Sequence, residues 1–311
     1  MIVNLDEAIQ ILLKGNVLAV PTETVYGLAA SLNNPVAIEK IFALKGRPRS
    51  NPLIVHVANI DKIKSYAKSL PPYFEELAKA FWPGPLTLII PIQTDLIPPL
   101  VRANLETAGF RIPHHSITLE LLQAVGPLVM PSANISGKPS ATSPIHVEED
   151  FGVDFPVLNG GTCARGIEST ILTYTNDQWM IARLGSLSPE DFQDVLGYQP
   201  GIIISNGSEK PLCPGQQFRH YAPKAKIIIG ERSKLDKIPF TLGFKERSYL
   251  HGGRIIILGS LENANEVAEN LYKALRQLDQ EGAPLAWVDM NFPREGLWLT
   301  IAERLNRAAE G

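Results

Sequence analysis

The stretch VLAVPTETVYGLAA, residues 17–30, carries the clearest indication of the fold. Its opening apolar residues predict a buried strand that ends at a turn. The Thr-Glu-Thr run that follows, with Gly27 soon after, places hydroxyl groups at the carboxyl end of this strand. Open α/β sheets bind their ligands at that edge. A plain turn with a helix cap accounts for the same residues, so the run alone does not decide between them.

Helices and strands alternate along most of the chain. Asn4 with Glu7 forms a capping box for a helix closed by Gly15, and a helix over 33–46 is capped by Asn34. Further helices are expected at 71–82, 116–125 (capped by Ser116) and 188–197 (capped by Ser188), and further strands at 53–57, 85–91, 128–130, 169–174 and 179–185. Because the last two strands are adjacent in sequence, we predict an α/β fold with a mixed sheet.

The pattern changes near residue 197, where Pro and Gly become frequent and no long periodic segment occurs. Beyond this region, strands are expected at 225–230, 254–260 and 285–290, and helices at 262–280 and 297–309. We therefore predict a larger α/β domain in 1–205, an interdomain linker in 206–224 and a second, smaller α/β domain in 225–311.

Composition excludes several classes of protein. The 311 residues are 45% hydrophobic and 20% charged, with a formal net charge of -3, so a nucleic-acid partner would need a local basic patch. The two cysteines lie far apart and predict neither a disulfide framework nor a zinc site. No signal peptide and no apolar run of about 18 residues is present. We expect a soluble, cytoplasmic protein.

The stretch PSANISGKPSATSP, residues 131–144, resembles a phosphate-binding loop but is not a Walker A motif. Pro139 follows Gly137-Lys138 and has no N–H to donate, and Ser132 stands where the motif requires Gly. Dinucleotide-binding, zinc-protease and nucleophile-elbow motifs are also absent. A nucleotide would therefore be bound by dispersed residues, and we expect Lys138 to be incidental to the site.

The segment KGRPRSN, residues 45–51, is the first dispersed candidate. It combines Lys45, Arg47 and Asn51 with prolines that stiffen the chain, and Arg can bind phosphate oxygens bidentately. Cations after a helix also complement its dipole, which is the alternative interpretation.

Other candidates are weaker when taken singly. Arg111 in GFRIPHH is equally explained as a surface arginine, and His56 lies in an apolar strand, where a core histidine is common. Glu23 and Glu168 are candidate general bases, but each is equally suited to cap a helix or pair with an arginine.

Taken in order, seven motifs resemble the YrdC-like threonylcarbamoyl-AMP synthases: PTETVYGL, KGRPRSNPLIVHV, WPGPLTLII, RIPHH, PSANISGKPSATS, GIESTIL and RLG. The later PGQQFRHYAP resembles the linker of the long, two-domain form. The resemblance implies an open, twisted sheet with a concave, positively charged face. It also implies a nucleotidyltransferase that converts L-threonine, bicarbonate or CO₂, and ATP into threonylcarbamoyl-AMP and pyrophosphate.

The resemblance also implies the residues of the site. The catalytic signature is matched by Lys45, Arg47, Ser132 and Asn134. ATP contacts are implied for Arg47, Asn51, Thr107, Ser132, Ser140 and Arg183, with His220 and Tyr221 in a linker that folds over the site as a lid. Threonine contacts are implied for Thr24, His56, Arg111 and Ser169. The alternative for the linker is a passive tether.

This chemistry needs positioning and charge neutralisation rather than a covalent nucleophile. Lys45 and Arg47 would hold the phosphates, with Mg²⁺ on the pyrophosphate and no metal site on the protein. Arg111 would pair with the threonine carboxylate, and Asn134 would contact the reacting carbamate.

The implied product passes to a tRNA threonylcarbamoyl transferase, without tight binding of tRNA or of a membrane. Two alternatives stay open at this point. One is an RNA-binding module. The other is the carbamoyl-adenylate-forming maturation enzyme. That enzyme contains cysteine-rich zinc fingers, which the two lone cysteines of this chain do not match.

Overall fold

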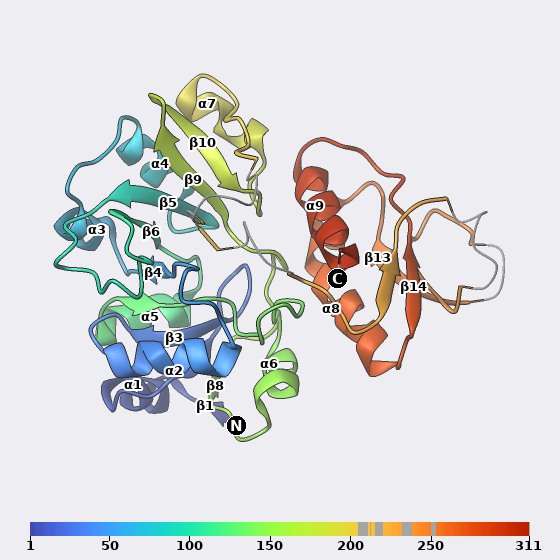
Figure 1. Cartoon of the computed structure of the whole chain (residues 1–311), viewed down its shortest axis with the longest axis horizontal. Coiled ribbons are helices and arrows are strands. Elements are labelled where there is room, and N and C mark those ends of the chain that lie inside the picture. Colours follow the sequence, from blue (N-terminus) through green and yellow to red (C-terminus); the bar gives the residue numbers. More distant parts are fainter. Residues whose placement is uncertain (205–210, 212, 215–219, 232–237, 250–252, 311) are drawn as a thin grey trace.

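The computed structural model describes residues 1–204, 211, 213–214, 220–231, 238–249 and 253–310. Their strands form two sheets, which lie in a larger and a smaller lobe (Figure 1). The strands of the larger sheet are β1 (Ile2–Val3), β2 (Leu18–Val20), β3 (Gly27–Ser31), β4 (Ile54–His56), β5 (Leu86–Pro91), β6 (Thr107–Arg111), β7 (Leu128–Val129), β8 (Val157–Leu158), β9 (Thr170–Thr175) and β10 (Gln178–Arg183).

The larger sheet is mixed, as predicted. Its order is β1-β8-β2-β3-β7-β4-β6-β5-β9-β10. The pairs β1–β8, β4–β6 and β5–β9 are parallel, whereas β2–β3, β5–β6 and β9–β10 are antiparallel. The helices of this lobe are α1 (Leu5–Leu13), α2 (Pro35–Lys45), α3 (Ile60–Tyr66), α4 (Phe74–Phe81), α5 (Ser116–Val125), α6 (Pro144–Phe151), the 3₁₀ helix η1 (Pro189–Phe192) and α7 (Gln193–Leu196).

Strand β2 shows how this sheet is buried on both faces. Leu18 and Val20 pack with the α1 and α5 side, whereas Ala19 belongs to the cluster on the opposite face. Successive side chains of a strand point to opposite faces, and all three of these are fully buried. The apolar run in the sequence is therefore a central strand covered on both sides, as its composition predicts.

The predicted helix boundaries are mostly confirmed. Asn4 and Glu7 form the capping box of α1, and the Asn34 side chain accepts a hydrogen bond at the start of α2. Ser116 is not a cap: it is the first residue of α5, and His115 occupies the cap position without a side-chain bond. The segment at 188–197 is split into η1 and α7.

The smaller sheet contains β11 (Lys226–Ile228), β14 (Leu285–Val288), β12 (Phe240–Phe244) and β13 (Arg254–Gly259), in that order and all parallel. The sequence did not predict β12, although it is an interior strand. Helices α8 (Ala264–Gln280) and α9 (Leu297–Ala309) lie on the side of this lobe that faces the larger one (Figure 1).

The predicted linker, 206–224, falls mostly outside the described residues. The division into 1–205, 206–224 and 225–311 therefore stays a prediction. No described helix combines the length and the apolar character needed to cross a membrane.

Candidate active site

A cavity in the larger lobe gathers most of the predicted site residues. It lies beside the loop 131–144 and the carboxyl ends of β4, β6 and β10. Ten of the predicted residues line it: Arg47, His56, Arg111, Ser132, Asn134, Ser140, Ser169, Arg183, His220 and Tyr221. Segments that are up to 174 residues apart in sequence (47 to 221) therefore meet at one place.

Four predicted residues do not line this cavity. Lys45 and Thr24 lie directly behind its wall and bond to residues that do line it. Asn51 is buried, and its Oδ1 has no hydrogen-bond partner among the residues that the structure describes. Thr107 borders a separate small hollow with Pro52 and Thr87, so the structure does not place it at the cavity.

Lys45 organises the loop that forms one wall of the cavity. Its Nζ donates to the carbonyl oxygens of Ser132 and Asn134, each at 2.6 Å, and the side chain is only 2% exposed. Burial, and then the charge of Arg47, lower the pKa of Lys45 well below its ordinary value. The two halves of the expected split motif are therefore joined directly by hydrogen bonds.

Asn134 holds the same loop from within. Its Nδ2 donates to the carbonyl oxygens of Ile135 (2.9 Å) and Lys138 (3.0 Å), while its Oδ1 is buried without a partner. Lys138 also lines the cavity and pairs with Asp150 at 2.9 Å. The expectation that Lys138 is incidental to the site stays a prediction, because its Nζ is engaged by Asp150.

Arg47 and Arg183 bring two positive charges to the cavity, and neither forms an ion pair among the described residues. Arg47 donates only to the carbonyl oxygens of Asn51 (3.2 Å) and Pro52 (2.8 Å) among the described residues. Arg183 donates to the carbonyl oxygen of Ser169 at 2.8 Å and to its Oγ at 3.1 Å. Burial, and then the charge of Arg183, lower the pKa of Arg47. Neither arginine forms an ion pair within the described chain, although the charge of Arg183 acts on the nearby Glu168 carboxylate, which also lines the cavity.

Arg111 forms a second polar centre. Its Nη1 donates to Thr24 Oγ1 at 2.9 Å, and its Nη2 lies 2.8 Å from Glu23 Oε1. The geometry of this ion pair is not that of a hydrogen bond, so Nη2 and Oε1 both remain without a hydrogen-bond partner. The Arg111 side chain is 5% exposed. A buried guanidinium with a free donor is suited to bind a carboxylate.

His56 lies beside this centre as a neutral imidazole. It is 3% exposed, and its Nδ1 lies 3.3 Å from the carbonyl oxygen of Ile54. Burial, and then the charge of Arg111, lower the pKa of His56 to about 3. At neutral pH this side chain offers a hydrogen bond and no charge.

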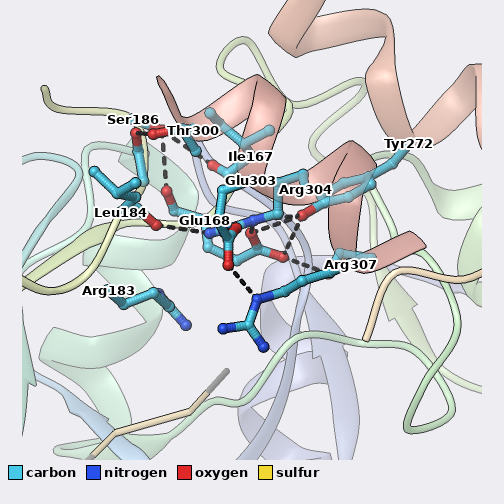
Figure 2. A network of polar contacts seen from close by, with 12 residues as sticks. Ile167, Glu168, Arg183, Leu184, Ser186, Tyr272, Thr300, Glu303, Arg304 and Arg307 are labelled. Carbon is cyan, nitrogen blue, oxygen red and sulfur yellow. Dashed lines mark hydrogen bonds and ion pairs between the residues drawn. The ribbon is translucent and has the colours of Figure 1, made fainter. Parts of the chain in front are cut away.

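Glu168 is the hub of a polar network at the edge of the cavity (Figure 2). It accepts hydrogen bonds from Ser140 Oγ (2.6 Å), Tyr272 OH (2.8 and 3.0 Å) and Arg304 Nε (3.1 Å). Burial raises the pKa of this carboxyl, but Arg304, Arg183 and the two hydroxyl donors outweigh burial and lower it overall. Of the alternatives for Glu168, pairing with an arginine is the one observed.

The sequence did not single out Tyr272 and Arg304, which come from α8 and α9. One signal was available: in α9, Arg304 falls on the apolar stripe formed by Ile301, Leu305 and Ala308. A charged residue within such a stripe is buried and therefore needs partners. What those partners are could not be read from the helix itself.

Comparisons with known proteins agree with this geometry. Residues 10–185 match the Sua5/YciO/YrdC family model, described as "Telomere recombination", and residues 187–310 match the model described as "Threonylcarbamoyl-AMP synthase, C-terminal domain". A threonylcarbamoyl-AMP synthase of Bacillus subtilis is 38% identical over 98% of this chain and 92% of its own length. One of Pyrococcus abyssi is 36% identical over 95% and 91%.

A solved structure agrees over the whole chain. The crystal structure of P. abyssi Sua5 complexed with L-threonine superimposes with a TM-score of 0.91 at 34% identity, covering 100% of this chain and 98% of that one. Both family models, the two relatives and this structure point to one assignment. The chain belongs to the Sua5/YrdC family of threonylcarbamoyl-AMP synthases and carries the C-terminal domain of its longer members.

Proposed function

We propose that this chain condenses L-threonine, bicarbonate or CO₂, and ATP into threonylcarbamoyl-AMP, with release of pyrophosphate. The observation that carries the proposal is the neighbouring pair Arg47 and Arg183, which faces the cavity and forms no ion pair among the described residues, although the Glu168 carboxylate also lines the cavity. Like charges in a partly buried site repel each other, and a bound polyanion relieves that repulsion. A triphosphate supplies that charge.

The centre at Arg111 supports a site for threonine in the same cavity. Its Nη2, which is ion-paired with Glu23 but forms no hydrogen bond among the described residues, would donate to the carboxylate, and Ser169 and Thr24 would bond the amine or hydroxyl. Because His56 is neutral, it would not repel the ammonium or compete for the carboxylate. The amino acid and the nucleotide would then share one confined space.

The reaction follows from this arrangement. The neutral amine of threonine captures CO₂ and loses a proton, which gives a carbamate. A carbamate oxygen attacks the α-phosphorus, and the bond to pyrophosphate breaks. Arg47, Arg183 and the loop 131–144 would position and neutralise the phosphates, and Asn134 would contact the carbamate. No covalent intermediate with the enzyme is needed.

The finer assignments are proposals as well. As a nucleotidyltransferase, the enzyme would use Mg²⁺ held by the phosphates of the nucleotide, since Mg²⁺ commonly binds substrate phosphates and keeps several waters. Lys45 would act through the wall loop, whereas the roles of Asn51 and Thr107 stay predictions. We also propose a cytoplasmic enzyme with the three-part division at 205 and 224, whose product a tRNA threonylcarbamoyl transferase consumes.

The decisive experiment measures pyrophosphate release from ATP and bicarbonate, with and without L-threonine. We expect release that depends on threonine and that carbamoyl phosphate cannot support. Pyrophosphate release that does not depend on threonine, or no release with all three substrates, would contradict the proposal. Tight, salt-sensitive tRNA binding in the absence of turnover would instead indicate an RNA-binding module.

The threonine site has its own test. Titration calorimetry with L-threonine is expected to show a large loss of affinity in Arg111→Ala. Arg49→Ala is the matched control, because the Arg49 side chain is 72% exposed and its ion pair among the described residues is with Glu39 on the surface. If Arg111→Ala binds threonine like the wild type, the threonine site lies elsewhere.

A further inference from the structure

Helix α9 inserts a buried arginine into the interface with the larger lobe. Arg304 is 1% exposed, and its Nε donates to Glu168 Oε2 at 3.1 Å. Its Nη2 donates to the carbonyl oxygen of Leu184 at 2.7 Å, in the segment directly after β10 (Figure 2). Tyr272 of α8 donates to both oxygens of the same carboxylate. The smaller lobe therefore fixes Glu168 from two helices.

Glu168 passes this constraint on to the loop 131–144. Its Oε1 accepts the hydrogen bond of Ser140 Oγ at 2.6 Å, and both side chains line the cavity. Glu168 also precedes Ser169, which binds Arg183. A shift of the Arg304 guanidinium would thus displace residues of the cavity wall through a single intervening carboxylate, that of Glu168.

Helix α8 holds the same loop at a second point. Arg276 is 5% exposed, and its Nη2 donates to the carbonyl oxygen of Pro139 at 2.6 Å and to Asp150 Oδ2 at 2.9 Å. The Asp150 carboxylate in turn accepts the backbone N–H of Ile135 (3.2 Å) and pairs with Lys138. Arg276 therefore fixes residues 135–139, which adjoin Ser140.

The linker residue Tyr221 is positioned by the same two helices. Its ring stacks on Tyr272 with centroids 5.3 Å apart, and the Arg304 guanidinium lies 4.7 Å from the ring centroid. Tyr221 lines the cavity, and the next residue, Ala222, donates its N–H to Gly137 at 2.9 Å. Linker, loop and smaller lobe are thus packed as one unit.

Stability alone does not explain two buried arginines at this interface. Burying an ion pair costs desolvation that its attraction barely offsets, and apolar residues of the same volume often stabilise as well or better. An arginine instead fixes geometry, because its planar donors hold several acceptors at defined angles. The acceptors here belong to the cavity wall.

We propose that Arg276 and Arg304 are positioning residues of the active site, so that the smaller lobe is a working part of the catalytic centre. They act through Asp150, Glu168 and the loop 131–144, and neither touches the substrates. The inference rests on the proposed function, in which this loop, Arg183 and Tyr221 hold the nucleotide. Among the described residues, no hydrogen bond or ion pair links α8 or α9 to Arg111, Thr24 or His56. Ser169 is the one proposed threonine contact that adjoins this network, and it does so through its neighbour Glu168 and through Arg183. The larger effect should therefore fall on ATP rather than on threonine.

The test compares Arg304→Met and Arg276→Met with the wild type. We expect the KM for ATP to rise and kcat to fall, by about 10- to 100-fold in kcat/KM for ATP, with the KM for threonine within about twofold of wild type. Arg304→Lys should recover part of the loss, since it restores the charge without the fork of donors. Arg254→Met is the matched control, because Arg254 pairs with Glu281 on the surface of the same lobe.

Folding and positioning are separated by the double variant Arg304→Met/Glu168→Gln. Removing both charges avoids an unpaired buried carboxylate, so this variant should fold, while Ser140 still loses its fixed partner and the ATP defect remains. Kinetics like wild type in the folded variants would overturn the inference, and so would equal increases in both KM values.

Failure of the proposed function can be distinguished from failure of the inference about Arg276 and Arg304. Calorimetric binding of a non-hydrolysable ATP analogue measures the nucleotide site without turnover. If the wild type binds the analogue but releases no pyrophosphate with threonine, the proposed function fails while the inference is still tested. If the variants bind the analogue as tightly as wild type, positioning of the nucleotide site by the smaller lobe is refuted.

Discussion

Replacing Arg304 by Met should make the stability of the protein depend on pH in a new way. The change leaves Glu168, which is 7% exposed in its side chain, without its buried cation. Breaking such a pair from one side costs about 3–5 kcal/mol at neutral pH, because the remaining charge is uncompensated. The bonds from Ser140 and Tyr272 remain and place the expected loss toward the lower end of that range.

The sign of the pH dependence follows from the carboxyl pKa. In the wild type the pKa of Glu168 is lowered, so the stability that it contributes is present above its unfolded value of about 4.3 and is lost as pH falls through the folded value. Without Arg304 the largest influence that lowers this pKa is gone, so we expect burial to outweigh Arg183 and the two hydroxyl donors and to raise the folded pKa above the unfolded one. Stability is then lost as pH rises above about 4.3. The deficit of Arg304→Met relative to wild type should therefore grow between pH 4.5 and 7.5.

Urea unfolding followed by tryptophan fluorescence measures this deficit. Trp287 and Trp298 report on the smaller lobe, where Arg304 lies, and Trp82 and Trp179 on the larger one. The variant Arg304→Met/Glu168→Gln carries no ionisable pair, so its deficit should be small and equal at both pH values. A coupling energy of about 2–3 kcal/mol is expected at pH 7.5. An Arg304→Met deficit that is the same at pH 4.5 and 7.5 would refute the reasoning.

Three further predictions concern single sites. Gly166 and Gly197 both have a positive φ (69° and 77°), so replacing either by Ala should cost about 1–2 kcal/mol of backbone strain in urea unfolding. Gly166→Ala should cost more than Gly197→Ala, because a Cβ at Gly166 would lie 2.3 Å from a backbone atom of α8, whereas at Gly197 it would meet nothing. Equal losses of stability would contradict close packing at Gly166. Cys163 and Cys213 are buried, and burial raises the pKa of each to about 12, so mass spectrometry should find little alkylation at pH 8 until urea is added. His56 should show no NMR titration between pH 5 and 8, since its pKa is about 3; a midpoint near 6.5 would place the ring in solvent.

Local patterns in the sequence were enough to predict much of the fold. The caps at Asn4 and Asn34 and the left-handed Gly46 fix helix ends through contacts within a few residues, so they are legible without tertiary structure. Ser116 was misplaced by one position because hydroxyl residues favour both the cap and the first turn. Strand β12 was not predicted, since its short segment 240–244 shows little alternation before it is paired in a sheet.

The sequence also predicted most of the cavity lining, because a series of motifs in fixed order identifies a family. It did not predict how each side chain is used. Thr107 lies four residues before Arg111 on β6, and a strand rises about 3.3 Å per residue, which separates the two by about 13 Å. Thr107 therefore borders another hollow, although it belongs to the same strand as Arg111.

The sequence by itself determined the alternation of most helices and longer strands, the mixed sheet and the candidate residues, since these depend on local periodicity and on motifs. It did not predict β1, β3, β6, β8, β12, α3 or α6. Only the tertiary structure decided that Lys45 holds the wall loop through carbonyl oxygens, and that Arg276 and Arg304 of the smaller lobe support the same wall. The physical reason is that the position and the role of a buried charged side chain depend on the groups to which it is bonded. Those partners lie 87 to 137 residues away in the sequence, where no local pattern records them.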